Sequence, residues 1–397
     1  MKYKTKLLLD RTIGPPAMIL LNAIVYSVGK VIRRDHSIKA SDIKSIAIQK
    51  IVGMGSIIEF SSSLKAIKRC YPDASIIFIS SLSNKDLLNL YYKYYIDNLV
   101  MIDDSSFLRL FFSTFSAILR LISKKIDLFF NLEVYSTFST FISVFSLARN
   151  RFGFYLRSSA FRKGLDTHHI FYNQHKNIRE IYGNMVNAAG CDDFDRNDLI
   201  KFSIPEETAS KINEFLIGNN IKEYILININ ASDLSPERRW VETNWIELIK
   251  LLIDKIGYMI LLSGITSERD YLQTEIVDNI EKKYLKHVIN IAGQFNIKEF
   301  ISIIRSCALF ITVDSGPYHL GMLENIKMVS LWGPENPFLY GMPKDNQIFI
   351  YKNIYCSPCV KQTYSPPCKG NNICMKNISV DEILEKTQLL LSDLNDS

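Results

Sequence analysis

The feature that most constrains the fold of this chain is an alternation, present twice, of short apolar runs with longer amphipathic runs. In the first series, strands are expected at 45–51, 75–80, 98–102 and 126–132, helices at 57–70, 84–94, 106–124 and 136–149, and a further short run at 151–156. In the second, strands are expected at 224–230, 258–264, 287–293, 308–314 and 327–333, and helices at 242–256, 267–284, 297–306 and 316–325. This pattern is typical of parallel-sheet α/β units. Because 397 residues suffice for two such domains, the sequence predicts an α/β protein with two doubly wound sheets in tandem.

A polar stretch without strong periodicity, at about 197–222, separates the two series. The expected organisation is a basic apolar segment at 1–44, one Rossmann-like domain at 45–205, a second at 206–378 and a C-terminal helix at 379–397. Ligands of doubly wound sheets bind at the carboxyl ends of the strands. We therefore expect the two sheet edges to face a shared cleft.

The formal net charge of +6 belongs to one end of the chain. Residues 1–44 hold nine of the 47 bases and three of the 41 acids, so the remainder is balanced. A balanced body gives no reason to expect nucleic-acid binding.

An uncharged apolar run at 12–29 is flanked by bases. Pro15, Pro16 and Asn22 argue against a helix that spans the bilayer, and no small-x-small cleavage site follows to favour a secretory signal. The favoured interpretation is a helix lying in the interface of an anionic membrane, with a helix packed on the body and a true span as alternatives. The expected location is the cytoplasm, peripheral on the inner face of the cytoplasmic membrane.

Polar loops follow two strands of the first series. Gly53, Gly55 and Ser56 open a helix after the first strand, and a two-glycine turn lets a ligand approach the backbone, although it is also a common strand-to-helix connection. Glu133 follows the fourth strand. A carboxylate there can serve as a general base, the alternative being a solvated or helix-capping acid.

The first strand of the second series leads into Asn230 and Ser232, followed by Arg238 and Arg239. Paired guanidinium groups after small polar side chains suit a diphosphate. The alternative is a surface ion pair between Glu237 and one of the arginines.

The segment 308–334 carries the strongest signal. An apolar strand ends at Asp314, Ser315 and Gly316 form a turn, and a helix is expected to begin at Pro317. The free N–H groups of such a helix can hold phosphate. His319 lies one turn inside, where it can donate to a phosphate or ribose oxygen; a structural histidine is the alternative.

The segments GMGS, NASDLSPERRW and VDSGPYHL…SLWGP resemble glycosyltransferase family 9, which includes the ADP-heptose:lipopolysaccharide heptosyltransferases. The resemblance implies a GT-B fold, an inverting mechanism without a metal or other required cofactor, and a nucleotide-sugar donor held mainly by the second domain. By position it implies that the donor diphosphate and sugar are held by Asp314, Ser315, Gly316 and His319. Arg238 takes the place of the family's phosphate-binding lysine, and Glu268 would bind the ribose.

One position departs from the family pattern. Heptosyltransferases usually have an aspartate, the base that deprotonates the acceptor, where this chain has Ser56. Our hypothesis makes Glu133 the base, with Glu59 in reserve. The expected function is transfer of a sugar, heptose from ADP-heptose as one candidate, to a lipid-linked or envelope saccharide; the alternative is a catalytically silent nucleotide-sugar-binding protein. A dinucleotide-dependent oxidoreductase is disfavoured because GMGSII lacks the third glycine of G-x-G-x-x-G.

Four of the seven cysteines cluster near the C-terminus, at Cys356, Cys359, Cys368 and Cys374. Their thiolates can complete a structural zinc or other metal site. Reduced free thiols and disulfides are the alternatives that the spacing leaves open.

Overall fold

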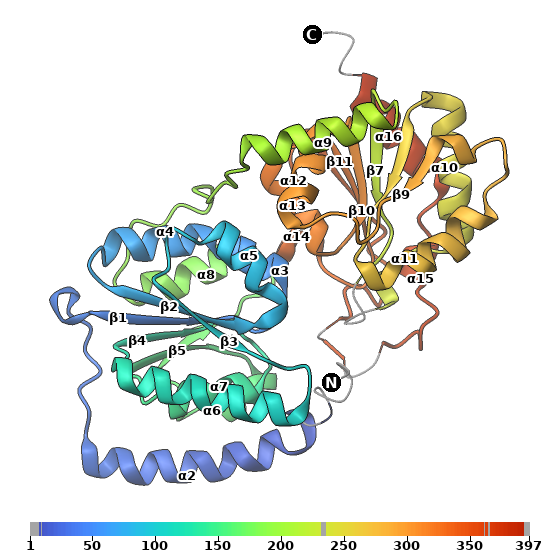
Figure 1. Cartoon of the computed structure of the whole chain (residues 1–397). Coiled ribbons are helices and arrows are strands. Elements are labelled where there is room, and N and C mark those ends of the chain that lie inside the picture. Colours follow the sequence, from blue (N-terminus) through green and yellow to red (C-terminus); the bar gives the residue numbers. More distant parts are fainter. Residues whose placement is uncertain (1–7, 9, 232–235, 361, 364–365, 393–397) are drawn as a thin grey trace. The chain divides into compact units, whose positions relative to one another are not determined.

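The computed structural model describes residues 8, 10–231, 236–360, 362–363 and 366–392. The chain divides into two compact units, one ending at Ile200 and the other beginning at Lys201. Each contains a six-stranded parallel sheet with helices on both faces, as Figure 1 shows. The predicted α/β class with two doubly wound sheets is confirmed, and the units are described separately below.

The sheet of unit 1 has the strand order β3-β2-β1-β4-β5-β6. Its strands are β1 (Ser45–Gln49), β2 (Ser75–Ser81), β3 (Asn98–Ile102), β4 (Leu128–Asn131), β5 (Asn150–Tyr155) and β6 (His168–Phe171). The order reverses between β1 and β4, where Gln49 pairs in register with Asn131. Doubly wound sheets bind ligands at such a switch point, and the segments after Gln49 and Asn131 lie there.

Two groups of helices cover the unit 1 sheet (Figure 1). On one face lie α3 (Met54–Glu59), α4 (Ser61–Cys70), α5 (Lys85–Tyr91) and α8 (Ile178–Asn187). On the other lie α6 (Phe107–Lys124), α7 (Thr137–Phe145) and, outermost, α2 (Gly14–Ile32). Apolar side chains of β1, β2, β4 and α6 fill the core on this second side, among them Ile77, Phe129 and Leu121.

Helix α2 packs on unit 1 through a narrow stripe. Met18 and Leu21 contact Val144 and Leu165 in a small apolar cluster, and the Asn22 amide donates to the Phe161 carbonyl oxygen at 3.1 Å. The helix is long and apolar enough to cross a membrane, yet only 11% of its apolar window is buried. It is therefore attached to the body while most of its apolar surface stays exposed.

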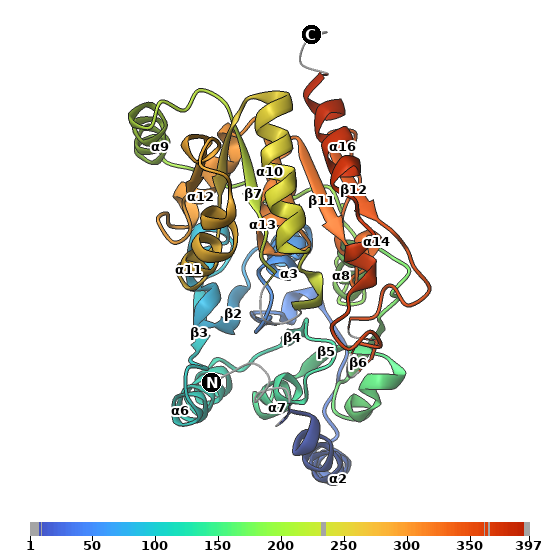
Figure 2. The same cartoon turned by 90° about the vertical axis from the view of Figure 1, so that its right-hand side faces the viewer.

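Unit 2 repeats the topology of unit 1, with the order β12-β11-β10-β7-β8-β9 and the switch point between β10 and β7. Its strands are β7 (Tyr224–Asn228), β8 (Met259–Leu262), β9 (Val288–Asn290), β10 (Leu309–Val313), β11 (Met328–Trp332) and β12 (Gln347–Tyr351). Helices α9 (Glu206–Gly218), α12 (Ile297–Ser306) and α13 (Gly316–Glu324) pack together on one face. Helices α10 (Glu242–Ile256) and α16 (Val380–Ser392) lie side by side on the other (Figure 2). Three shorter helices are α11 (Arg269–Tyr271), α14 (Pro337–Tyr340) and α15 (Ile373–Lys376).

Several expected elements differ in the structure. The stretch at 197–222 contains α9, whose weak periodicity follows from its burying only Ile212 while Ile217 is 75% exposed. The expected helix at 267–284 is instead a succession of short turns, including a π-turn at Leu272–Ile276. The helix at 57–70 is interrupted at Phe60, where α3 ends and α4 begins. Strands β6 and β12 and helix α8 were not predicted.

Candidate functional site

Hydrogen bonds connect the turn after β10 to the ends of the neighbouring strands of unit 2. The Ser315 hydroxyl donates to Asn228 Oδ1 at 3.4 Å, and the Asn228 amide donates to the Ser263 carbonyl oxygen at 3.1 Å. The last residue of β7 and residues just after β8 and β10 are thus joined by polar side chains. These contacts fix the turn at the switch point, as the strand-end pattern predicts.

Helix α13 begins immediately after this turn. Ser315 is its N-cap with extended backbone, and Gly316 and Pro317 are its first residues. Among the described residues, the N-cap side chain makes no hydrogen bond to the first-turn N–H groups. A helix start of this kind, with its dipole, suits an anionic oxygen.

Arg238 lies between two buried carboxylates beside the start of α13. Its Nε atom is 3.4 Å from Asp314 Oδ2, and one Nη atom is 3.3 Å from Glu335 Oε2. The other Nη atom donates to the Asp314 carbonyl oxygen at 3.5 Å. The three side chains are 15%, 6% and 5% exposed in the order Arg238, Asp314 and Glu335.

The structure therefore brings together Arg238 and Asp314, two residues that the sequence placed at the site. It also adds Glu335, which the sequence reasoning missed. The available signal was its position just after β11, in the same strand-end setting as Asp314. Among the described residues, the Arg238 guanidinium forms ion pairs with Asp314 and Glu335.

The loop after β7 is held at both ends. Arg239 donates to the Ala231 carbonyl oxygen at 3.3 Å. The Asn372 amide donates to the carbonyl oxygens of Glu237, at 3.0 Å, and Arg239, at 2.7 Å. The Asn230 side chain is 5% exposed, and its amide nitrogen has no hydrogen-bond partner among the described residues. Ser232 lies outside the described residues.

Glu268 and His319 flank the same sheet edge. Glu268 Oε2 accepts from the N–H of Ile265 at 2.8 Å, which caps the turn after β8. A Cβ atom at Gly264 would lie 2.8 Å from that oxygen, so a larger residue there would displace the Glu268 carboxylate. His319 is 6% exposed and meets the Tyr318 ring edge-on at 5.1 Å between centroids. The roles predicted for Glu268 in ribose binding and for His319 in phosphate binding stay predictions.

In unit 1, Glu133 binds the turn that follows β1. Its Oε2 atom pairs with Lys50 Nζ at 3.0 Å, and Oε1 accepts from the N–H groups of Ile51, at 2.8 Å, and Val52, at 3.0 Å. Burial acts to raise the pKa of the Glu133 carboxyl, but the Lys50 charge and the two N–H groups outweigh it and hold the pKa below its ordinary value. Glu133 is therefore ionised at neutral pH.

The turn itself depends on glycine. Gly53 has a φ of +99°, in a region that L side chains rarely adopt, and it precedes the first turn of α3. Gly55 and Ser56 lie inside that first turn. Glu133 and the GMGS segment thus share one edge of the unit 1 sheet, as predicted.

Glu59, the reserve base, has a different setting. Its Oε2 atom lies 2.5 Å from Arg179 Nε, and the two side chains are 1% and 2% exposed respectively. A carboxylate enclosed in this way joins α3 to α8 and is shielded from an acceptor. Glu59 is therefore poorly placed to act as the base.

The four clustered cysteines lie around the loop after β11. The Cys359 N–H donates to the Pro334 carbonyl oxygen at 2.9 Å, and Cys374 Sγ lies 3.0 Å from where a Gly333 side chain would begin. The cysteines are free, and the described residues contain no group of three or more His, Cys, Asp or Glu placed to hold a metal ion. Burial, together with the neighbouring thiols, raises the pKa of Cys359 and Cys374 to about 11. Both thiols are neutral at pH 7, and the metal alternative stays a prediction.

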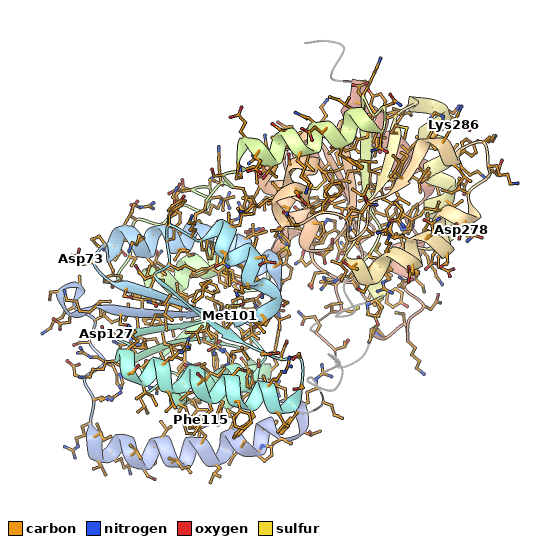
Figure 3. The ribbon with its side chains drawn as sticks, in the orientation of Figure 1. Asp73, Met101, Phe115, Asp127, Asp278 and Lys286 are labelled. Carbon is orange, nitrogen blue, oxygen red and sulfur yellow. The ribbon has the colours of Figure 1, made fainter. Side chains whose placement is uncertain are left out.

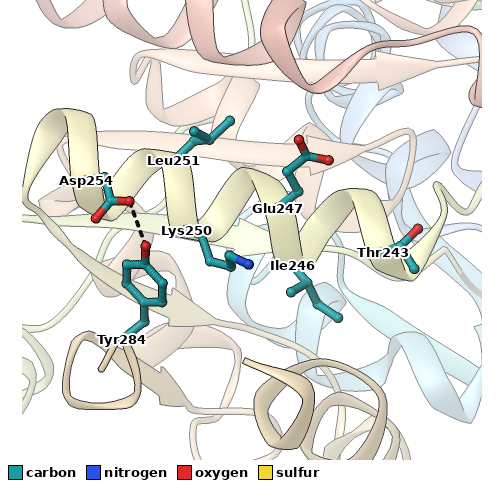
Figure 4. Close-up of a pocket in the computed structure, with 7 residues that line it drawn as sticks. All are labelled: Thr243, Ile246, Glu247, Lys250, Leu251, Asp254 and Tyr284. Atoms are coloured by element: carbon teal, nitrogen blue, oxygen red, sulfur yellow. Dashed lines mark hydrogen bonds between the residues drawn. The ribbon is translucent and has the colours of Figure 1, made fainter. Parts of the chain in front are cut away.

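A surface pocket on unit 2 lies elsewhere (Figure 4). It runs along α10 and includes Tyr284, whose hydroxyl donates to Asp254 at 2.7 Å. Its lining contains none of the strand-end residues described above. In unit 2 the candidate residues therefore lie at the carboxyl edge of the sheet and not in this pocket.

Known proteins resemble this chain in sequence and in fold. The family model for glycosyltransferase family 9 (heptosyltransferase) matches residues 138–369. Lipooligosaccharide heptosyltransferase 2 of Campylobacter jejuni is 29% identical over 180 residues, which are 45% of this chain and 54% of that protein. This chain thus spans about half the length of the curated relatives it matches first.

Two solved structures share the fold. The glycosyltransferase family 9 protein of Veillonella parvula has a TM-score of 0.70 and 21% identity, covering 90% of this chain and 99% of its own. The ADP-heptose lipopolysaccharide heptosyltransferase II of Escherichia coli has a TM-score of 0.68 and 19% identity, covering 89% of this chain and all of its own. Likenesses at these identities show the fold.

Proposed function

This chain belongs to glycosyltransferase family 9, and we propose that it transfers a sugar from a nucleotide-sugar donor to a saccharide of the cell envelope. ADP-heptose is the first candidate donor, with heptose the sugar transferred, and lipopolysaccharide is the first candidate acceptor. The names of the similar proteins contain these terms. In the proposed inverting reaction, an acceptor hydroxyl attacks the anomeric carbon from the side opposite the diphosphate. The bond between that carbon and the diphosphate oxygen breaks, and the hydroxyl proton passes to a carboxylate.

The observation that supports a donor site in unit 2 is the position of Arg238 beside the start of α13. One Nη atom of Arg238 bonds to the Asp314 carbonyl oxygen, one residue before the N-cap. The guanidinium therefore lies close to the first N–H groups of α13, which the Ser315 side chain leaves uncapped. Both stabilise negative charge on a departing diphosphate, which is the charge that develops in the transition state. Asn230, Ser232, Arg239, Ser315, Gly316 and His319 complete the proposed donor site, and Glu268 is the proposed ribose ligand.

We propose Glu133 as the group that accepts the proton. It is ionised, it lies at the switch point of unit 1, and it is bound to the glycine turn where the family has its aspartate. A carboxylate of lowered pKa is a weak base in the ground state. The acceptor hydroxyl becomes more acidic as its bond to the anomeric carbon forms, so proton transfer late in the step suits such a group.

The proposed reaction places the protein on the cytoplasmic side of the envelope, where donor and lipid-borne acceptor meet. Stabilisation of the diphosphate by Arg238 and α13 supplies what a metal ion supplies in other transferases. The proposal requires no metal or other cofactor for the transfer step.

The test has two stages. First, the change in melting temperature is measured with ADP-, UDP-, GDP- and CDP-sugars; preferential stabilisation by ADP-sugars supports ADP-heptose, and preference for another base removes heptose from first place. Second, release of the nucleoside diphosphate is measured with and without a lipopolysaccharide core acceptor. Acceptor-dependent release supports the enzyme. Donor binding with no such release supports the alternative, a silent nucleotide-sugar-binding protein, which the serine at position 56 motivates.

A substitution of Arg238 tests whether this residue binds the donor diphosphate. Arg238→Gln should weaken donor binding at least about tenfold, because charge-assisted bonds to phosphate are among the strong ones. The matched control is Lys282→Gln, which also removes one positive charge from unit 2 but at an exposed position. If both variants bind the donor as the unmodified protein does, the assignment of Arg238 is wrong.

A further inference from the structure

Helix α6 is apolar on both of its sides. Thr114, Ala117, Ile118 and Leu121 are buried toward the sheet. Its outer side nevertheless carries large apolar side chains that are between 38% and 67% exposed, namely Phe107, Leu108, Phe111, Phe112, Phe115, Leu119 and Ile122. Phe115, labelled in Figure 3, points away from the sheet. A surface helix of a soluble domain ordinarily presents polar residues there.

Helices α7 and α2 continue the same apolar surface. Both α6 and α2 pack against α7, on the same side of the unit 1 sheet (Figures 1 and 2). Phe141 and Phe145 of α7 are 36% and 39% exposed. The exposed apolar residues of α2 and its flanks are Ile13, Ile19, Leu20, Ile24, Tyr26, Val28, Val31 and Ile32. We call these outer sides of α2, α6 and α7 together the apolar face; contiguous exposed surfaces of this kind mark interaction sites.

Bases outnumber acids around the apolar face. Asp10, Asp35, Asp103, Asp104 and Asp127 border its two main segments, and Asp103 pairs with Arg109. Residues 11–34 contain four bases and no acid, and residues 105–126 again contain four bases and no acid. The bases are Arg11, Lys30, Arg33, Arg34, Arg109, Arg120, Lys124 and Lys125. Among those near the end of α6, Arg120, Lys124 and Lys125 are exposed. The occupant of this surface must therefore be apolar at its centre and negatively charged at its border.

We propose that the apolar face docks unit 1 onto an anionic phospholipid membrane, with the aromatic side chains of α6 and the apolar side of α2 in the headgroup and acyl boundary. Exposed phenylalanine and leucine side chains insert at that depth, and lysine and arginine contact the anionic headgroups. A second copy of the chain fits less well. A two-fold interface through this face would set one basic border against another, and like charges placed together oppose association.

The attachment of α2 to the body supports a helix that lies on the membrane. Asn22 bonds to Phe161, and the Arg34 guanidinium donates to the Leu147 carbonyl oxygen at 2.7 Å. A helix held at both its middle and its end against α7 and the following loops keeps its axis beside unit 1. The proposal concerns binding to lipid alone and does not rest on the proposed transfer reaction.

The experiment is vesicle flotation of the full chain without donor or acceptor. Vesicles of phosphatidylethanolamine with phosphatidylglycerol are compared with vesicles of phosphatidylcholine. We expect the protein to float with the anionic vesicles and to dissociate as salt rises. The double variant Phe112→Ser, Phe115→Ser and the double variant Arg120→Glu, Lys124→Glu should each lower the partition coefficient at least about tenfold.

Two single variants in unit 2 serve as controls, each making one change of the same kind. Ile217→Ser alters a side chain that is 75% exposed on α9, and Lys282→Glu reverses an exposed charge; both should float as the unmodified protein does. Thermal unfolding by circular dichroism checks that the variants are folded. The proposal is overturned if the unmodified protein stays with the soluble fraction, or if the phenylalanine variant floats unchanged. It is also overturned if sedimentation shows a dimer that this variant dissociates while no protein binds vesicles.

Discussion

Burial and the charge of Lys50 act in opposite directions on the carboxyl group of Glu133. Because Lys50 and the backbone N–H groups outweigh burial, the pKa of this carboxyl lies below its ordinary value of 4.5. A proton acceptor with that property keeps its charge as the pH falls. The pKa of the proposed base therefore depends on Lys50, a partner 83 positions away in the sequence.

The pH dependence of transfer tests this pair. If Glu133 is the base, the acid limb of kcat/KM should lie below pH 4.5, because the ionised form persists to that point. Lys50→Met removes the opposing charge, so burial raises the pKa and the acid limb should move to higher pH. Lys85→Met, at an exposed position on α5, is the control and should leave the profile in place. An unchanged limb in Lys50→Met would contradict the assignment of Glu133.

The pair of Glu59 and Arg179 makes a prediction about stability. Arg179→Met leaves a carboxylate buried without its partner and should lower the free energy of unfolding by about 3–5 kcal/mol. Adding Glu59→Leu should restore much of that loss, since no buried charge remains. Arg196→Met, which breaks a partly exposed pair with Glu180, should cost about 1 kcal/mol or less. Urea unfolding measures all three; equal effects of Arg179→Met and Arg196→Met would show that the buried pair is not structural.

At the scale of elements, α16 belongs to the core of unit 2. Ile383 and Leu390 are buried with the side chains of α10 and the strands, and the Trp240 indole donates to the Ile378 carbonyl oxygen at 3.1 Å just before the helix. The C-terminal helix predicted at 379–397 is described at Val380–Ser392. It covers one face of the sheet next to α10.

Substitutions on the buried and the exposed side of α16 should have different effects on the free energy of unfolding. Ile383→Ala should lower the free energy of unfolding by about 2–5 kcal/mol, because it removes buried methyl groups and leaves a cavity. Leu389→Ala changes a side chain that is 51% exposed on the same helix and should have an effect within about 0.5 kcal/mol. Denaturant unfolding of the two variants gives the comparison. A small effect of Ile383→Ala would mean that α16 contributes little to unit 2.

At the scale of the whole molecule, two units of the same topology have different chemistry at their switch points. Unit 1 presents a glycine turn bound by a carboxylate, and unit 2 presents a helix start beside an arginine. Binding of the donor should therefore increase the protection of backbone amides in unit 2 and not in unit 1. A ligand that binds only the folded state stabilises it by about 2.7 kcal/mol at a concentration one hundred times its dissociation constant.

Hydrogen exchange with ADP present provides the measurement. We expect increased protection after β7 and around the start of α13, in the segments 228–231, 236–240 and 312–319, with the GMGS turn little changed. The physical reason is that phosphate oxygens accept directly from the N–H groups of a helix start. The reverse pattern, protection of the GMGS turn alone, would place the nucleotide in unit 1 and contradict the proposal.

The sequence by itself determined the two doubly wound sheets and the strand ends that carry chemistry. Helices 242–256 and 297–306 were predicted with the bounds that the structure shows, because hydrophobic period and capping residues are local properties. The local pattern gave no correct prediction in two places. Helix α9 buries a single residue and so lacks an apolar period, and the segment after β8 forms short irregular turns where one helix was expected.

Only the tertiary structure decided the partners of the charged groups. Arg238 meets Glu335 across 97 positions, and Glu59 meets Arg179 across 120. Such pairs depend on which strands are neighbours in a sheet and on which helices cover it. The same holds for α6, whose helical bounds were predicted but whose exposed apolar side was not. A periodic pattern shows that a helix forms; which of its sides is covered depends on the elements that pack against it.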